Sequence, residues 1–339
     1  MKKILCCLMV LWSAIVLAVG LNRASAFHEE VMTHTMLEQG LKPEDYQDAF
    51  WKLDKRDRSR LPENYRTMSD KYFSAAEIKY GPQDEKLFAG LEQVKMSGSA
   101  EFTEKQFAAM VEDIRRTAGK EVHIVVVDLR QENHLFVNGE AVSLRDPKRN
   151  FNNLGMNTEE VLLKEATLKK ELQHKTIKLG TLHKNKKHGD TIEFAEVPVQ
   201  SVMTEAELCR KYNVEYLRLA CTDHMMLADT YIDEFISYVK RMPENTWLHI
   251  HCAAGVGRTG VIMCLYDMLQ NPELPVKTIA QRQNLLGANN VLRKSKHKHN
   301  WLNPFLREKA TEMRLLSRYV KENHANNYNT TWSRFHSMH

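Results

Sequence analysis

Residues 251–260, HCAAGVGRTG, decide the fold of this 339-residue chain. The stretch has the spacing Cys-x5-Arg, with Cys252 and Arg258 separated only by small or apolar residues. The apolar residues 247–250 before it predict a buried strand, and the spacing of apolar residues over 261–269 predicts an amphipathic helix. A strand, a loop of small residues and a helix N-terminus together form a cradle of backbone N–H groups for an anion.

A cysteine at the base of such a cradle predicts a nucleophile. Converging amides and the helix dipole stabilise the thiolate, which is the nucleophilic form of Cys252. Arg258 adds a planar guanidinium that donates two parallel hydrogen bonds to phosphate oxygens. We therefore predict attack of Cys252 on a phosphate ester, with no metal and no cofactor. The alternative, a buried cysteine packed under a glycine loop, leaves the arginine and the strand–helix context unexplained.

The second group that this chemistry needs is an acid. The leaving oxygen of a phosphate ester departs as an alkoxide unless a carboxylic acid protonates it. Asp223 follows a predicted strand and would lie at the same sheet edge as the loop. Its rivals Asp229 and Asp233 begin a predicted helix, where acidic residues are common. We predict that Asp223 protonates the leaving group and then activates water against the phosphocysteine.

The first 26 residues have the pattern of an export signal. Lys2 and Lys3 precede an apolar run that reaches about Gly20, and residues 24–26 form a small-x-small cleavage site. We expect a signal peptide over residues 1–26 and an exported protein, periplasmic or secreted, without stable membrane association. Its cleavage removes three cations from a formal net charge of +5, so overall charge does not favour a nucleic-acid partner.

The rest of the chain follows the rhythm of an α/β domain, with one interruption. The β-branched run 122–127 predicts a buried parallel strand. A hairpin that turns at Asn138-Gly139 and two later strand-like runs then break the rhythm. We expect a loosely packed lead-in over residues 27–60 and a main α/β domain formed by residues 61–133 and 203–339. Residues 134–202 should form a small β-rich insertion.

Two basic segments bear on the substrate. Lys184, Lys186 and Lys187 lie in a turn-rich part of the insertion, and residues 293–298 form a second basic run. Either segment alone is typical of a solvated loop. Together with a phosphate cradle they favour a small polyanionic substrate.

The run LACTDH, residues 219–224, followed one helix later by HCAAGVGRT, resembles the bacterial cysteine phytases of the protein-tyrosine-phosphatase superfamily. Residues 128–143, 199–208, 282–283 and 307–309 are similar as well, so the resemblance covers most of the chain after residue 26. It implies a phosphatase domain, with a central mostly parallel sheet flanked by helices, and a small inserted partial β-barrel. It also implies stepwise removal of phosphates from myo-inositol hexakisphosphate and lower inositol phosphates.

The resemblance assigns roles to single residues. Cys252 would be the nucleophile, Asp223 the general acid and base, and Arg258 the phosphate binder. Thr259 would assist the departing thiolate, and His251 would tune Cys252. The remaining substrate-binding residues would be those of the loop itself and the polar groups around it: Ala253, Ala254, Gly255, Val256, Gly257, His224, Arg66, Lys186, Lys187 and Lys309.

Three positions depart from the pattern of that family. Ala253 stands where the family often has glutamate, and residues 225–227 replace a Trp-Pro type pair. Residues 301–306 are apolar where better-known members present a lysine and a tyrosine to the substrate. A phosphatase for phosphotyrosine, of dual specificity or for phosphoinositides is therefore an alternative. A catalytically silent phosphate-binding module is another, although Cys252, Asp223 and Arg258 are all present. The oligomeric state is not indicated.

Overall fold

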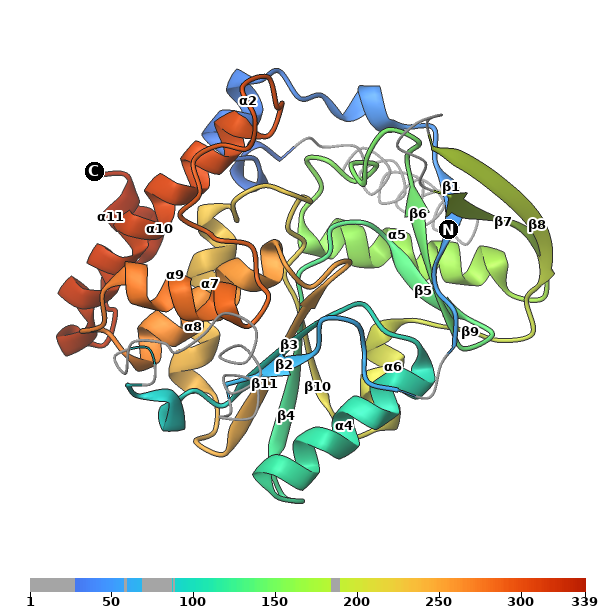
Figure 1. Ribbon diagram of the computed structural model, residues 1–339. Coiled ribbons are helices and arrows are strands. Elements are labelled where there is room, and N and C mark those ends of the chain that lie inside the picture. Colours follow the sequence, from blue (N-terminus) through green and yellow to red (C-terminus); the bar gives the residue numbers. More distant parts are fainter. Residues whose placement is uncertain (1–27, 58–59, 69–86, 88, 184–189) are drawn as a thin grey trace, which may run out of the picture.

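The computed structural model describes residues 28–57, 60–68, 87, 89–183 and 190–339, and these residues form two sheets with helices around them (Figure 1). The predicted signal peptide and Lys184, Lys186 and Lys187 lie outside the described residues. In the described part of the chain, no helix is long and apolar enough to cross a membrane.

The first sheet has five strands and is mostly parallel, as the sequence predicted. Its order is β10-β4-β11-β3-β2, and only the pair β2–β3 is antiparallel. The strands, in chain order, are β2 (Arg66–Thr67), β3 (Met96–Ala100), β4 (His123–Asp128), β10 (Glu215–Arg218) and β11 (Thr246–Cys252). Since β11 lies between β4 and β3 and every residue of it is buried, its carboxyl end is held from both sides.

Helices cover both faces of this sheet, which explains the continuous apolar runs of its strands. Val125 and Leu248 pack against one group of helices, whereas their neighbours Val126 and Trp247 pack against another. The first group is α7 (Asp229–Arg241), α8 (Arg258–Gln270), α9 (Val276–Leu285), α10 (Asn303–Asn323) and α11 (Trp332–His336). The second group is α4 (Glu104–Ala118) and α6 (Glu205–Lys211).

Local signals account for several element boundaries. Thr204 and Glu207 form the expected capping box, in which each side chain accepts a hydrogen bond from the other residue's backbone N–H at 3.3 and 2.9 Å. Asn138 and Gly139 have φ values of 53° and 82°, as a two-residue hairpin turn requires. This turn joins β5 (His134–Val137) to β6 (Glu140–Arg145).

The second sheet has six strands in the order β8-β7-β1-β6-β5-β9. Besides the hairpin it contains β1 (Phe50–Lys55), β7 (Thr176–His183), β8 (Thr191–Pro198) and β9 (Val202–Met203), and α5 (Thr158–Leu172) contacts β5 and β9. The order is open, with β8 and β9 at its two edges, and the partial barrel stays a prediction.

The structure corrects the expectation of a loosely packed lead-in over residues 27–60. The strand β1 lies between β6 and β7 and pairs with both. Periodicity missed it because a six-residue strand of mixed polarity acquires its hydrogen bonds from partners about ninety residues later in the chain. The β-rich unit is therefore completed by an N-terminal strand.

Candidate active site

Cys252 lies at the carboxyl end of β11, where the strand gives way to the loop before α8. Its side chain is almost fully buried, and two hydrogen-bond donors point at the sulfur. The Gly255 backbone N–H donates to Sγ at 3.3 Å, and the Thr259 hydroxyl donates to it at 3.2 Å. Both donors can stabilise negative charge on the sulfur during catalysis, because a charged acceptor makes stronger hydrogen bonds.

The loop needs glycine at one position in particular. Gly255 has a φ of +71°, and a Cβ there would lie 2.3 Å from the backbone N of Ala100 and the backbone C of Ser99. Any side chain at residue 255 would therefore collide with strand β3. At Gly257, by contrast, an added Cβ would lie 3.9 Å from its nearest neighbour among the described residues, the side-chain nitrogen of Asn289.

Three carbonyl groups of the loop accept hydrogen bonds from residues outside it. The acceptors are the carbonyl oxygens of Ala253, Ala254 and Val256, which are turned toward donors outside the loop. The donors are, in the same order, the Glu101 N–H at 3.4 Å, the Asn64 side chain at 2.9 Å and the Asn289 N–H at 2.8 Å. Sequence reasoning missed all three.

Arg258 begins α8 and is held by a carboxylate that the sequence analysis did not single out. Its guanidinium makes two parallel hydrogen bonds to Glu132, Nη1 to Oε2 at 2.8 Å and Nη2 to Oε1 at 2.9 Å. Burial opposes the charge, yet Glu132 and Asp223 outweigh it and hold the pKa of Arg258 well above its usual range. The Nε atom is buried and has no acceptor among the described residues, which leaves one donor for a ligand.

Glu132 also ties the active site to the second sheet. Burial raises its pKa, but Arg258 and Arg130 outweigh that effect and lower the pKa of Glu132 to about 2. Arg130 contacts Glu132 through Nε at 3.0 Å, Glu101 through Nη1 at 2.6 Å and Asp54 of β1 through Nη2 at 3.2 Å. The charges at 128, 130 and 132, directly after a buried strand, were the signal that could have identified this network.

Replacing Glu132 with glutamine is expected to lower the free energy of unfolding by about 3–5 kcal/mol, because two buried guanidinium groups lose their shared anion. Since the folded-state pKa lies below the unfolded one, this contribution is present above about pH 4.5 and is lost as the pH falls toward about 2. Urea unfolding at about pH 7 and about pH 3 measures the difference.

The matched control is Glu322→Gln, whose carboxylate pairs with Arg318 at the surface of α10. It should change the free energy of unfolding by less than about 1 kcal/mol, because exposed pairs are screened by solvent. An equally small change for Glu132→Gln would contradict the anchoring role.

Asp223 lies beside the guanidinium of Arg258. Its Oδ1 lies 3.3 Å from Arg258 Nη2, and its Oδ2 accepts a hydrogen bond from the Asn150 side chain at 3.1 Å. The rivals point elsewhere: Asp229 accepts from the indole of Trp332, and Asp233 accepts from the backbone N–H of the same residue. Of the three predicted candidates, the fold therefore brings only Asp223 to the cysteine loop.

The acid loop, residues 219–228 between β10 and α7, contacts the C-terminal helix α10. His224 has a φ of 68°, and its carbonyl oxygen accepts a hydrogen bond from Lys309 Nζ at 3.1 Å. Burial lowers the pKa of Lys309 to about 8. Met225, in place of the Trp-Pro type pair, is fully buried with Phe151 and Phe305. Lys309 thus supports the acid loop from behind.

His251 is buried on the other side of β11, away from the sulfur. Its Nε2 lies 2.7 Å from Glu205 Oε1 and 3.6 Å from Asp128 Oδ1. Asp128, Glu205 and His134 are close enough to share a cation. Arg218 already supplies positive charge there, with Nη1 2.6 Å from Asp128 Oδ2. The role of His251 in tuning Cys252 stays a prediction.

A cavity of about 430 Å³ opens above the sulfur, lined by Cys252, Asp223, His224, Arg258 and residues 253, 254, 256 and 257 of the loop. Its further lysines and arginines are Lys52 and Lys55 of β1, Arg145 at the end of β6, and Lys148 and Arg149 in the segment that follows β6. The sequence analysis missed these five, because nothing in their local pattern links them to residue 252.

Arg66 is not among the residues that line this cavity, and its role as a substrate contact stays a prediction. Its side chain is only 1% exposed, and Nη1 donates to the Asn64 carbonyl at 3.0 Å. Burial lowers the pKa of Arg66 to about 10. Lys309 also lies outside the cavity lining, although it holds the acid loop.

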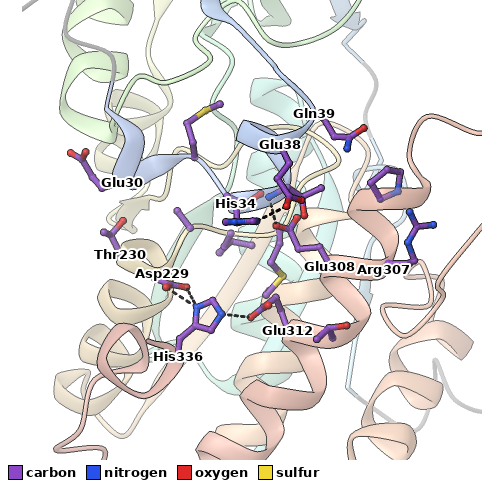
Figure 2. A pocket seen from close by; sticks show the side chains of 18 of the residues that line it. Glu30, His34, Glu38, Gln39, Asp229, Thr230, Arg307, Glu308, Glu312 and His336 are labelled. Carbon is purple, nitrogen blue, oxygen red and sulfur yellow. Dashed lines mark hydrogen bonds and ion pairs between the residues drawn. The ribbon is translucent and has the colours of Figure 1, made fainter. Parts of the chain in front are cut away.

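A larger cavity, of about 930 Å³, lies against the segment that follows the acid loop. His336 lies between Asp229 and Glu312 (Figure 2). Its Nδ1 is 2.8 Å from Asp229 Oδ2, and its Nε2 is 3.3 Å from Glu312 Oε2. Glu30, Glu38 and Glu308 line the same cavity. This excess of carboxylates repels a polyanion, so the smaller cavity above Cys252 is the candidate phosphate site.

Comparisons with known proteins agree with this site. Residues 127–270 match the family model described as PTPlike_phytase, inositol hexakisphosphate. The effector protein hopD2 of Pseudomonas syringae pv. tomato is 29% identical over 184 residues, which are 54% of this chain and 38% of that protein. This chain therefore spans well under half of that curated relative.

Two solved structures are similar over most of this chain. The PTP-like myo-inositol phosphatase from Mitsuokella multacida, in complex with myo-inositol-(1,3,4,5)-tetrakisphosphate, is 34% identical with a TM-score of 0.75, and the match covers 89% of this chain and 51% of that one. A PTP-like phytase from Bdellovibrio bacteriovorus is 27% identical with a TM-score of 0.66, and the match covers 86% and 95%.

Proposed function

We propose that this chain, which belongs to the protein-tyrosine-phosphatase-like phytase family, removes phosphate groups from myo-inositol phosphates. The observation that carries the proposal is the sulfur of Cys252, which receives two hydrogen bonds at the base of a cavity lined by cations. The inositol tetrakisphosphate bound by the Mitsuokella protein supports the substrate class.

The first chemical step forms a phosphocysteine. Loop amides and Arg258 hold the oxygens of one phosphate group, with the free Nε available as a donor. The Cys252 thiolate attacks phosphorus, and the bond from phosphorus to the ring oxygen breaks. The carboxyl of Asp223, beside Arg258, gives its proton to that oxygen as it leaves.

The second step returns the enzyme to its starting state. The Asp223 carboxylate takes a proton from a water molecule, which attacks phosphorus as the sulfur–phosphorus bond breaks. The Thr259 hydroxyl, 3.2 Å from Sγ, stabilises the thiolate as it departs. Inorganic phosphate is released with Asp223 protonated again.

Pure protein incubated with inositol hexakisphosphate is expected to release phosphate, with a KM that rises severalfold as salt increases. The reason is that ionic strength of about 0.15 M shortens the Debye length to roughly 8 Å, from roughly 30 Å at 0.01 M. Ion chromatography of the products measures phosphate release, and its rate at several substrate concentrations gives the KM at each salt concentration. The control is p-nitrophenyl phosphate, whose KM should depend less on salt. Turnover of phosphotyrosyl peptide alone would overturn the substrate class.

We also propose that the protein is exported, periplasmic or secreted, on the strength of the signal pattern in residues 1–26.

A further inference from the structure

Arg149 lies in the segment after β6 that reaches the active-site cavity. Its guanidinium carbon is 3.3 Å from the centroid of the Trp301 ring, so the cation lies against the face of the indole. Trp301 comes just before α10, and its ring stands edge-on to the ring of His224, with centroids 5.8 Å apart. A cation from the second sheet is thus stacked beside the acid loop of the first.

The arginine of the stack reaches the cavity of the reacting groups. Arg149 lines the same cavity as Cys252 and Arg258. The next residue, Asn150, donates to the Asp223 carboxylate at 3.1 Å. Arg149 also lines an adjoining cavity of about 440 Å³ together with Trp301, and so forms part of the wall between the two. A ligand whose phosphate group is held at Cys252 would meet Arg149 on the side of the acid loop.

Arg149 is free to bind an anion. Among the described residues no carboxylate or carbonyl accepts a hydrogen bond from its guanidinium, whereas Lys55, in the same cavity, is paired with Glu63 at 2.5 Å. An arginine held flat on an aromatic ring keeps the edges of its planar fork available, and that fork matches two oxygens of a phosphate.

We infer that Arg149, stacked on Trp301, binds a second phosphate group of the substrate while Cys252 attacks the first. The stack holds a cation at Trp301 that comes from a distant part of the chain. The pair thereby sets the preference for multiply phosphorylated substrates over single phosphate esters. This inference rests on the proposed function.

The test compares Arg149→Met with the unchanged protein on two substrates. For inositol hexakisphosphate we expect KM to rise about tenfold with kcat within about twofold, since a charge-assisted hydrogen-bond pair is lost. For p-nitrophenyl phosphate, which has one phosphate group, both constants should stay within about twofold. The matched control is Arg241→Met, which removes an arginine stacked on Tyr238 of α7 and should change neither substrate.

Two further variants separate binding from folding. Trp301→Leu should raise KM for inositol hexakisphosphate less than Arg149→Met does, because the charge remains but its orientation is lost. The double variant should match Arg149→Met alone, since the two side chains act as one unit. Thermal unfolding of each variant reports whether the fold is retained.

Three results would overturn the inference: an unchanged KM for inositol hexakisphosphate in Arg149→Met, an equal loss on both substrates, or additive effects in the double variant. An equal loss would mean that Arg149 only supports the acid loop. Failure of the proposed function looks different, because the unchanged protein would then release no phosphate from inositol hexakisphosphate.

Discussion

Cys252→Ser is expected to lower phosphate release by at least about 10⁴-fold while inositol hexakisphosphate still binds. A serine hydroxyl at this position would receive the same two donors, from Gly255 and Thr259, yet an alcohol stays protonated where a thiol ionises. The amides of the loop and Arg258 do not depend on the sulfur, so the phosphate cradle remains. Binding is therefore separated from bond breaking.

Two measurements check this expectation. Rapid acid quench of the unchanged protein should trap phosphate on Cys252, and calorimetry of the serine variant should give a dissociation constant close to the KM of the unchanged protein. Full hydrolysis by Cys252→Ser would exclude the phosphocysteine route. A failure to trap phosphate, with hydrolysis proceeding, would do the same.

The matched control is Cys264→Ala, on the helix that follows the loop. Burial raises the pKa of the Cys264 thiol, and its side chain is fully buried in the helix core. It therefore lacks the donors that activate Cys252, and its removal should leave kcat nearly unchanged. Iodoacetamide should label Cys252 before Cys264 for the same reason.

Asp223→Asn is expected to reduce kcat for inositol phosphates by about 10²–10⁴-fold, since the amide has no proton to give the leaving alkoxide. The reduction should be much smaller for p-nitrophenyl phosphate, whose leaving phenolate needs no proton. Binding should persist, because the amide oxygen can still accept from Arg258, while the Asn150 side chain can turn its own oxygen toward the new NH2 group. Steady-state kinetics on the two substrates give the comparison.

Asp229→Asn is the control for this substitution. It changes a rival acid that contacts Trp332 and His336 instead of the cavity. It should lower the melting temperature, because α11 loses a contact. The ratio of kcat for inositol phosphates to kcat for p-nitrophenyl phosphate should stay unchanged. An equal loss on inositol phosphate and aryl phosphate in Asp223→Asn would exclude a general-acid role for Asp223.

The fold class followed from the sequence because its evidence is local. A buried strand, a loop of small residues and a helix are contiguous over residues 246–270, so their geometry depends on near neighbours. The hairpin at Asn138 and the capping box at Thr204 were predictable for the same reason: the residue types that a turn or a helix start requires are all within reach of one short window.

The surroundings of the loop were less predictable. Glu132 is 126 residues from Arg258, and Arg149 is 152 from Trp301. Arg66, close in the chain to other cations, was predicted to contact the substrate, and its side chain is almost fully buried. A basic side chain in a sequence carries no sign of which way it points, because that depends on the packing of elements distant in the chain.

The amino-acid sequence by itself determined the candidate nucleophile, its strand–loop–helix setting, and the candidate acid, since each is encoded by residues next to one another. Only the tertiary structure decided which carboxylate anchors Arg258, which of three aspartates reaches the cavity, and which cations line it. The physical reason is that these contacts join two sheets, and their side chains meet only after the long-range pairing of β1 and the packing of both units.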